Sequence, residues 1–282
     1  MNLFYVPVLA LLAVFTIYPV ISGIQLSFTN WDGYSADRAF AGLENYGRLL
    51  TDSTFRSVFV NTLIYGIGST AIQQVLGLGL ALALNRRFRL RGAVRAVVYL
   101  PVLISPIIMG VMYYLLFQYN FGALNTVIEA FGGEKVVWFE KGSTAVAIVV
   151  IVNSLQYVGV SMIIYLAGLQ SIPEDLTQAA SLDGASGWKL FWHITLPLLQ
   201  PAFATSIVLN LIGGLKLYDV IKVLTGGGPG YATNSVSTYI SVVYFNDQSA
   251  GYASAMGVAL FVVIALCTLA LNALLNRTRV EM

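Results

Sequence analysis

The sequence predicts an all-α, polytopic integral membrane protein with six transmembrane helices. Of its 282 residues, 57% are hydrophobic and 10% are Lys, Arg, Asp or Glu, whereas soluble domains carry about 25% charged residues. The mean hydropathy is +0.78. Six apolar runs are each long enough to cross a bilayer, which takes about 20 helical residues. These observations exclude most classes of soluble enzyme.

The six apolar runs cover residues 3–24, 58–84, 93–117, 145–169, 201–224 and 253–275. Helices are expected because backbone groups in lipid must find their hydrogen-bond partners within the segment. The runs lack the short alternating pattern of about ten residues that is typical of membrane β-strands. In the third run Ser105 precedes Pro106, which marks a point where a helix can break. We treat residues 1–282 as a single transmembrane domain.

Basic residues in the short loops predict the orientation in the cell membrane. Cytoplasmic loops carry an excess of Lys and Arg. The loop between the second and third runs and the C-terminal tail are both basic, and their arginines are Arg86, Arg87, Arg89, Arg91, Arg277 and Arg279. With six spans, both termini, this basic loop and the loop at residues 170–198 are expected in the cytoplasm.

The loop at residues 170–198 is long for a connection without a function of its own. Ser171 and Glu174 have the spacing of a capping box at a helix start. Gly184 is expected to end that helix in the left-handed conformation, and a second helix is expected to follow from Gly187. A short helix with small residues on its face suits docking into a groove. An amphipathic helix lying on the lipid surface is the alternative.

Polar side chains recur within the spans at helical spacing. Asn153 and Tyr157 are four residues apart in the fourth run, and Asn210 and Gly214 repeat this spacing in the fifth. Polar residues inside spans tend to face cavities or pathways, although such residues also pack helices together, and the sequence leaves both readings open. The residues expected to line a polar path are Ser105, Asn153, Gln156, Tyr157, Gly159, Ser161, Asn210, Gly214, Leu217 and Tyr218.

Three charged residues lie in the outer half of the fifth run, and they are Lys216, Asp219 and Lys222. We expect them to pair with one another or to extend towards the membrane surface. Gln73 and Gln74 in the second run have no assigned role.

Several functional classes lack support in the sequence. It contains no G-x-x-x-x-G-K-[ST] phosphate-binding loop. With a single histidine, His193, and a single cysteine, Cys267, it offers neither a metal cluster nor a Cys–His pair. The net charge of +2 is too small to indicate nucleic-acid binding. We therefore expect no enzymatic activity, no metal and no cofactor in this chain.

The segment SIPEDLTQAASLDGASGWKLFWHITLPLLQP, which contains the loop, resembles the cytoplasmic loop of binding-protein-dependent ABC importer permeases. The family pattern is Glu-Ala-Ala, a short gap, Asp-Gly-Ala, and later Ile-x-Leu-Pro. Gln178 departs from it, since the family has Glu there, and this removes a charge from the expected docking face. The stretch YDVIKVLTGGGPGYAT resembles sugar-type permeases of the maltose and glycerol-phosphate group. By itself this second stretch is also a simple glycine-rich turn.

The resemblance implies the fold of a type I importer permease whose loop is a coupling helix that docks on a separate ATPase. The residues implied in coupling are Glu174, Gln178, Ala179, Ala180, Asp183, Gly184 and Ala185. It also implies a second permease subunit, two ATPase subunits that hold ATP and Mg²⁺, and an extracytoplasmic binding protein. The expected substrate is a sugar or oligosaccharide. Glycerol 3-phosphate or another polar solute remains an alternative, as does an ion-coupled symporter, which would need a buried carboxylate.

Overall fold

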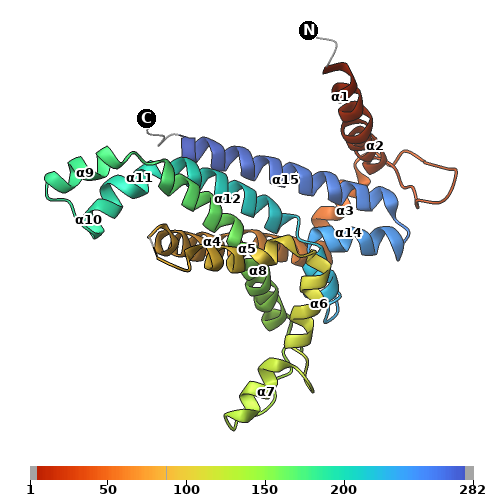
Figure 1. The fold of residues 1–282 in the computed structure, drawn as a ribbon. Coiled ribbons are helices and arrows are strands. Elements are labelled where there is room, and N and C mark those ends of the chain that lie inside the picture. The colour runs from red at the N-terminus through yellow and green to blue at the C-terminus, as the bar shows by residue number, and fades with distance from the viewer. Residues whose placement is uncertain (1–4, 87, 277–282) are drawn as a thin grey trace.

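The structure is a computed structural model that describes residues 5–86 and 88–276. The start of the first predicted span at residue 3, together with Arg87, Arg277 and Arg279, lies outside these ranges. Within them the regular elements are helices, apart from one isolated bridge between Thr29 and Phe40 (Figure 1). The α-helices are α1 (Tyr5–Leu12), α2 (Tyr18–Ser27), α3 (Glu44–Thr51), α4 (Ser53–Asn85), α5 (Arg91–Leu103), α6 (Pro106–Leu116), α7 (Ala123–Ala130), α8 (Gly142–Ser171), α9 (Glu174–Leu182), α10 (Trp188–Leu190), α11 (Leu196–Leu198), α12 (Gln200–Leu215), α13 (Asp219–Leu224), α14 (Val236–Phe245) and α15 (Ala250–Asn276).

Within the described residues, the apolar helices account for up to six membrane spans. Four helices are each long and apolar enough to cross a membrane, and two more spans arise when each strongly bent helix pair is counted as one span. Short π-helical segments, Ala13–Ile17 and Phe191–Thr195, join α1 to α2 and α10 to α11. The all-α membrane fold predicted from composition and hydropathy is therefore confirmed, with breaks that hydropathy does not reveal.

The third span is not one continuous helix over residues 93–117. α5 ends at Leu103 and α6 begins at Pro106, and the two helices are bent by 102°. Ser105 has φ −50° and ψ 133°, the extended conformation that a following proline imposes. The break thus lies at the Ser105–Pro106 step, where the sequence marks it.

The fifth span is also displaced from the predicted residues 201–224. α12 ends at Leu215, and Lys216 to Tyr218 leave the helix before α13 begins at Asp219. The apolar unit instead combines Trp188–Leu198 with Gln200–Leu215, bent by 65°. Pro197 and Pro201 flank this bend, and proline lacks the N–H that a continuous helix requires.

The centre of the bundle is formed by α4, α8 and α12 (Figure 1). Glycines let these helices approach closely, as is common in membranes. A Cβ at Gly77 of α4 would clash with the Ser161 Cβ of α8. A Cβ at Gly214 of α12 would lie 2.8 Å from the Gly66 Cα and 2.9 Å from the Tyr65 carbonyl oxygen of α4. Backbone therefore meets backbone where α12 crosses α4.

Side chains of α4 hold the segment that follows α13 and contains the glycine-rich stretch. The Asn61 amide donates to the carbonyl oxygens of Ala232, at 2.8 Å, and Asn234, at 3.2 Å. The Tyr65 hydroxyl donates to the Thr233 carbonyl oxygen at 2.8 Å. Gly227 has φ +91° within this segment. The stretch is thus a turn fixed to α4 by buried hydrogen bonds.

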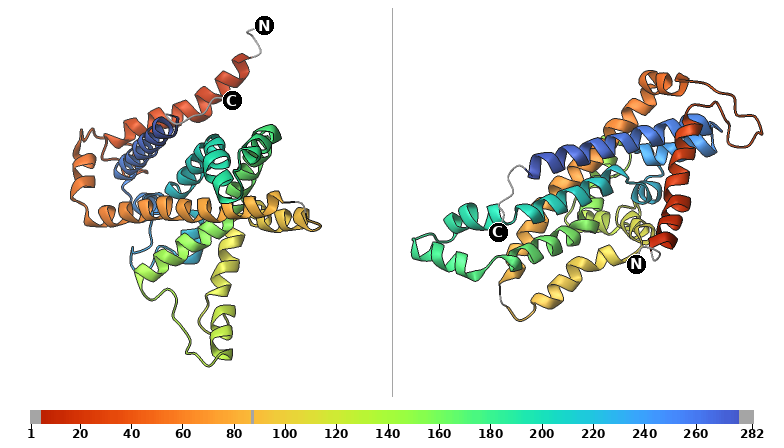
Figure 2. Two further views of the ribbon diagram at one scale, coloured as in Figure 1. Left: turned by 90° about the vertical axis from the view of Figure 1, so that its left-hand side faces the viewer. Right: turned by 90° about the horizontal axis from the view of Figure 1, so that it is seen from above.

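The first span lies at the edge of the bundle. α2 packs on α15, whereas α1 buries no residue and projects from the other helices in Figures 1 and 2. Its exposed side chains are apolar, with Phe15 of the π-helical segment 73% exposed. Among the described residues of this chain, the N-terminal half of the span therefore buries no side chain.

The loop at residues 170–198 forms two short helices that extend beyond the bundle (Figure 1). The predicted capping box is wrong. Ser171 is still the last residue of α8, and its hydroxyl bonds back to the Gly168 carbonyl at 2.8 Å. The predicted left-handed end is confirmed, because Gly184 has φ +81°. The Ala185 N–H donates to the Ala180 carbonyl oxygen at 2.9 Å, the pairing that closes a helix with such a residue.

Candidate functional site

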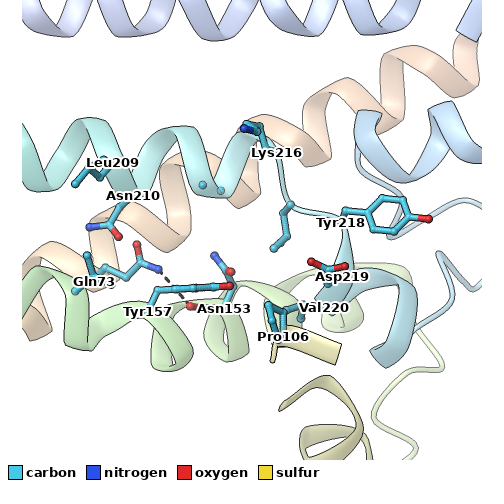
Figure 3. Close-up of a pocket in the computed structure, with 14 residues that line it drawn as sticks. Gln73, Pro106, Asn153, Tyr157, Leu209, Asn210, Lys216, Tyr218, Asp219 and Val220 are labelled. Atoms are coloured by element: carbon cyan, nitrogen blue, oxygen red, sulfur yellow. Dashed lines mark hydrogen bonds between the residues drawn. The ribbon is translucent and has the colours of Figure 1, made fainter. Parts of the chain in front are cut away.

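A polar cavity of about 270 Å³ lies among the central helices, beside the break between α5 and α6 and the interruption between α12 and α13 (Figure 3). It is bordered by α4, α8 and α12, by the first residue of α6, and by the segment that joins α12 to α13. Its lining residues are Gln73, Pro106, Asn153, Tyr157, Val160, Leu209, Asn210, Gly213, Gly214, Lys216, Leu217, Tyr218, Asp219 and Val220. Discontinuous helices commonly border substrate sites in transporters, because their breaks free backbone and side-chain groups.

Two buried amides form the end of the cavity that lies nearer the loop at residues 170–198. Gln73 is 1% exposed, and its Nε2 donates to the Asn153 carbonyl oxygen at 3.2 Å. Asn210 is 7% exposed, and its Nδ2 donates to Ser161 Oγ at 2.7 Å and to the Ser206 carbonyl oxygen at 2.9 Å. Both amide nitrogens are thus bound to neighbouring helix atoms, while Gln73 Oε1 is buried without a hydrogen-bond partner.

Charged groups lie at the other end, where α12 is interrupted. Figure 3 shows Lys216 at the end of α12 and Asp219 on the side facing Tyr157 and Asn153. The expected pairing among Lys216, Asp219 and Lys222 does not occur, since the one ion pair among the described residues joins Lys135 to Glu129. The break after Leu215 explains this for Lys216, which does not share a continuous helix with Asp219. Asp219 and Lys222 both lie in α13 and still form no ion pair.

Six of the ten predicted path residues line this cavity, and they are Asn153, Tyr157, Asn210, Gly214, Leu217 and Tyr218. The other four do not. Ser105 is exposed beside the lining Pro106. Gly159 faces α5, where a Cβ would lie 2.8 Å from the Val98 carbonyl oxygen. Ser161 supports Asn210 from behind. Gln156 is fully buried, with neither amide atom hydrogen-bonded.

Sequence reasoning missed Gln73. The signal for it is a face of α4 on which Ser69, Gln73 and Gly77 recur every four residues, the same spacing that identified the faces of α8 and α12. This face meets α8, since Ser69 Oγ donates to the Val150 carbonyl oxygen at 3.4 Å. Both a packing surface and a path give such a pattern, which is why position alone does not separate them.

The loop at residues 170–198 presents most of the predicted coupling residues to solvent. Glu174, Gln178, Ala179, Asp183 and Gly184 are exposed, Ala185 is half-buried, and Ala180 is buried. The predicted small apolar face is therefore divided, with Ala180 turned inward. Leu182 is 90% exposed and Trp188 is 73% exposed, so this loop also displays large apolar side chains to solvent.

Other chemistry has little support in the structure. Among the described residues, no group of three or more His, Cys, Asp or Glu side chains could hold a metal ion. His193 Nδ1 lies 3.0 Å from the Lys189 carbonyl oxygen on the exposed loop. Cys267 is half-buried in α15 and is not in a disulfide. The polar cavity and the exposed loop remain the two candidate functional regions.

Comparison with known families decides the class of this protein. Residues 75–280 match the family described as "Binding-protein-dependent transport system inner membrane component". The chain belongs to this family. The matched range includes α8, the exposed loop, α12 and α13, and therefore most of the cavity lining. As a transport component, the protein is a multi-pass membrane permease and not an enzyme.

Several curated relatives span nearly the whole chain. The trehalose/maltose transport system permease protein MalF of Thermococcus litoralis is 36% identical over 93% of this chain and 88% of its own length. The probable starch degradation products transport system permease protein AmyD of Thermoanaerobacterium thermosulfurigenes is 34% identical over 99% of this chain and 95% of its own. The multiple sugar-binding transport system permease protein MsmF of Streptococcus mutans is 32% identical over 93% and 90%.

Solved structures resemble the fold closely. A chain of a bacterial ABC transporter involved in the import of the acidic polysaccharide alginate superposes with a TM-score of 0.84 at 26% identity, covering 96% of this chain and 93% of that one. A second structure of a bacterial alginate ABC transporter, in complex with an alginate pentasaccharide-bound periplasmic protein, gives a TM-score of 0.85 at 26% identity, covering 99% and 95%.

Proposed function

We propose that this permease moves a sugar or oligosaccharide inward across the cytoplasmic membrane through the polar cavity between α4, α8 and α12. The observation that carries the proposal is the position of this cavity, beside the break between α5 and α6 and the interruption between α12 and α13, with side-chain amides and tyrosines in its lining. A sugar that crossed lipid without partners would lose the hydrogen bonds of each hydroxyl, at several kcal/mol apiece. The named activities of the curated relatives support the same substrate class.

The exposed loop at residues 170–198 is the site at which a separate ATPase docks and drives transport. Its support is the rigid closure of α9 at Gly184, followed by a second turn at Gly187 with φ +50°. Such a short, hydrogen-bonded unit can transmit movement from the ATPase to α8 and α12, which it joins directly. ATP and Mg²⁺ are held by two copies of the ATPase, and this chain holds no cofactor. Both termini and this loop lie in the cytoplasm.

The complete importer contains a second permease subunit and an extracytoplasmic binding protein. The exposed, apolar N-terminal half of the first span supports a protein neighbour in the membrane, because α1 buries no residue against the described part of its own chain. The remaining apolar surfaces contact lipid. A binding protein agrees with the family description and with the periplasmic protein in the related alginate transporter structure.

Two alternatives are less well supported. Glycerol 3-phosphate would favour fixed positive charge, yet the cavity lining contains one cation, Lys216, and also one carboxylate, Asp219. An ion-coupled symporter would require a carboxylate within the path, and Asp219 is the sole carboxylate among the lining residues. It lies at the interrupted end of α12, which is a position at the mouth of the path.

Uptake by the purified complex tests this proposal. The tagged permease would be isolated with its partner subunits from native membranes, reconstituted in vesicles, and supplied with the loaded binding protein. We expect uptake of radiolabelled sugar that requires ATP and continues when an ionophore collapses the proton and sodium gradients. Uptake that stops with the ionophore but proceeds without ATP would establish the symporter instead.

A further inference from the structure

The two amides at the inner end of the cavity have orientations that their surroundings fix. An amide has a nitrogen end that donates and an oxygen end that accepts, and the two ends are often hard to distinguish by shape alone. Gln73 and Asn210 each lie against a backbone carbonyl oxygen, those of Asn153 and Ser206. A backbone carbonyl can only accept, so the nitrogen of each amide must face it and the oxygen must face elsewhere.

The carbonyl oxygens of these amides form no hydrogen bond with the described residues. Gln73 Oε1 is buried and has no hydrogen-bond partner among the described residues, and a buried acceptor left without a donor is destabilising. In Figure 3 this oxygen points away from the Asn153 bond and towards the side on which Asn210 lies. Asn210 Nδ2 makes three contacts, of which the third is to Ser206 Oγ at 3.3 Å. None of the Asn210 hydrogen bonds involves Oδ1.

At the inner end of the cavity, the groups of Gln73 and Asn210 that have no hydrogen bond are therefore both acceptors. Asn153 and Tyr157 beside it can both donate and accept, and the one cation of the lining, Lys216, lies at the opposite end, where α12 is interrupted. A hydroxyl group satisfies two neighbouring carbonyl oxygens by donating a proton. A carboxylate or phosphate offers only acceptor oxygens, which the two amide oxygens would repel.

We propose that Gln73 and Asn210 select a ligand that donates hydroxyl protons at the inner end of the cavity, which makes uncharged sugars the substrate class and disfavours acidic ones. The inference rests on the proposed function and names the substrate class of the same site. It distinguishes this permease from the structurally similar transporter that imports the acidic polysaccharide alginate. Gln73 is the specificity residue, because it supplies the buried acceptor without a partner.

The test measures ligand binding directly, so that the binding protein's own selectivity does not enter. The purified permease–ATPase complex in detergent would be titrated, without its binding protein, with maltotriose, trehalose, arabinotriose and trigalacturonate. Saturation-transfer NMR gives the dissociation constants at millimolar ligand. We expect at least one neutral sugar to bind and trigalacturonate to bind at least tenfold more weakly than that sugar.

Two substitutions separate the acceptor role of Gln73 from a structural one. Gln73→Met and Gln73→Glu both remove the bond to the Asn153 carbonyl, but glutamate keeps acceptor oxygens. We expect Gln73→Met to weaken binding of the neutral sugar about tenfold, as the loss of one buried hydrogen bond implies, and Gln73→Glu to stay within about threefold of the unmodified protein. Thr70→Val is the matched control, since Thr70 Oγ1 is also buried and unpartnered on α4 but lies outside the cavity.

The outcomes distinguish this inference from the function on which it rests. Equal weakening by the Met and Glu variants, or tighter binding of trigalacturonate than of every neutral sugar, would overturn the selection of hydroxyl donors. ATP-dependent uptake would still stand in that case. Absence of ATP-dependent uptake for every sugar would contradict the proposed function itself. Size-exclusion profiles identical to that of the unmodified complex confirm that each variant is folded.

Discussion

Replacing Gly214 by alanine tests the close crossing of α12 and α4 that forms one side of the cavity. The added Cβ would lie 2.8 Å from the Gly66 Cα and 2.9 Å from the Tyr65 carbonyl oxygen. Both neighbours are backbone atoms, so no side chain can rotate away. Carbon atoms at rest are about 3.5–4.0 Å apart, so the two helices would have to separate by roughly half an ångström or more.

The magnitude follows from the cost of overpacking a close interface. An inserted methyl group in a tightly packed site costs about 1–3 kcal/mol, and a chain of this size loses roughly 2–4 °C in its unfolding midpoint for each kcal/mol. We therefore expect Gly214→Ala to lower the apparent midpoint by about 2–12 °C. The adjacent Gly213 is the matched control, because a Cβ there meets nothing within 4 Å.

The assay is thermal unfolding of the two purified variants in the same detergent, followed by tryptophan fluorescence and size-exclusion chromatography. Gly213→Ala is expected to unfold at or above the temperature of the unmodified protein, since alanine favours the helix by up to about 1 kcal/mol over glycine. If both variants unfold at the same temperature, or Gly213→Ala is the less stable one, the description of the α4–α12 crossing is wrong.

The remaining predictions concern the coupling loop and the buried polar groups. Gly184→Val should uncouple ATP hydrolysis from sugar uptake, because a β-branched residue is strained at φ +81°. Gly132→Val introduces the same strain, at φ +80° in a different loop, and should leave the ratio of hydrolysis to uptake unchanged. Equal ratios in the two variants would contradict the role of the 170–198 loop in transmitting movement. Gln156→Leu should leave the unfolding midpoint unchanged or raise it, since neither amide atom has a partner, whereas Asn61→Leu should lower it by several degrees because it removes bonds to the Ala232 and Asn234 carbonyls. Calorimetry that ranks these two variants in the reverse order would count against the buried hydrogen-bond assignments.

Composition and hydropathy were sufficient for the fold class, because a chain with so few charges cannot cover a soluble surface. They did not place the breaks in two spans. Hydropathy averages over a window, and Lys216 to Tyr218 form too short an interruption to lower that average decisively. Short elements were missed for the same reason: α3 and α14 have 8 and 10 residues, below the length of a membrane span.

The candidate site was predictable where a helical face repeats a polar pattern. Asn153 with Tyr157 and Asn210 with Gly214 follow four-residue spacing and line the cavity. Gly159 and Gln156 share the same helix but face other directions, and a sequence pattern does not tell which neighbour each face meets. Gln73 shows the converse, since its importance depends on an oxygen left without a partner. That property exists only once three helices are packed together.

Sidedness of the loop at residues 170–198 is the most direct test of the account, because every later step requires a cytoplasmic ATPase to reach it. Position 182 is 90% exposed in this loop, and position 121 is 88% exposed in the loop that follows α6. Leu182→Cys and Phe121→Cys would each be made in a Cys267→Ala background and treated with a membrane-impermeant maleimide.

We predict that the thiol at position 121 reacts in intact cells, whereas the thiol at position 182 reacts only after permeabilisation and is protected when the ATPase is bound. Labelling of position 182 from outside intact cells would contradict the account.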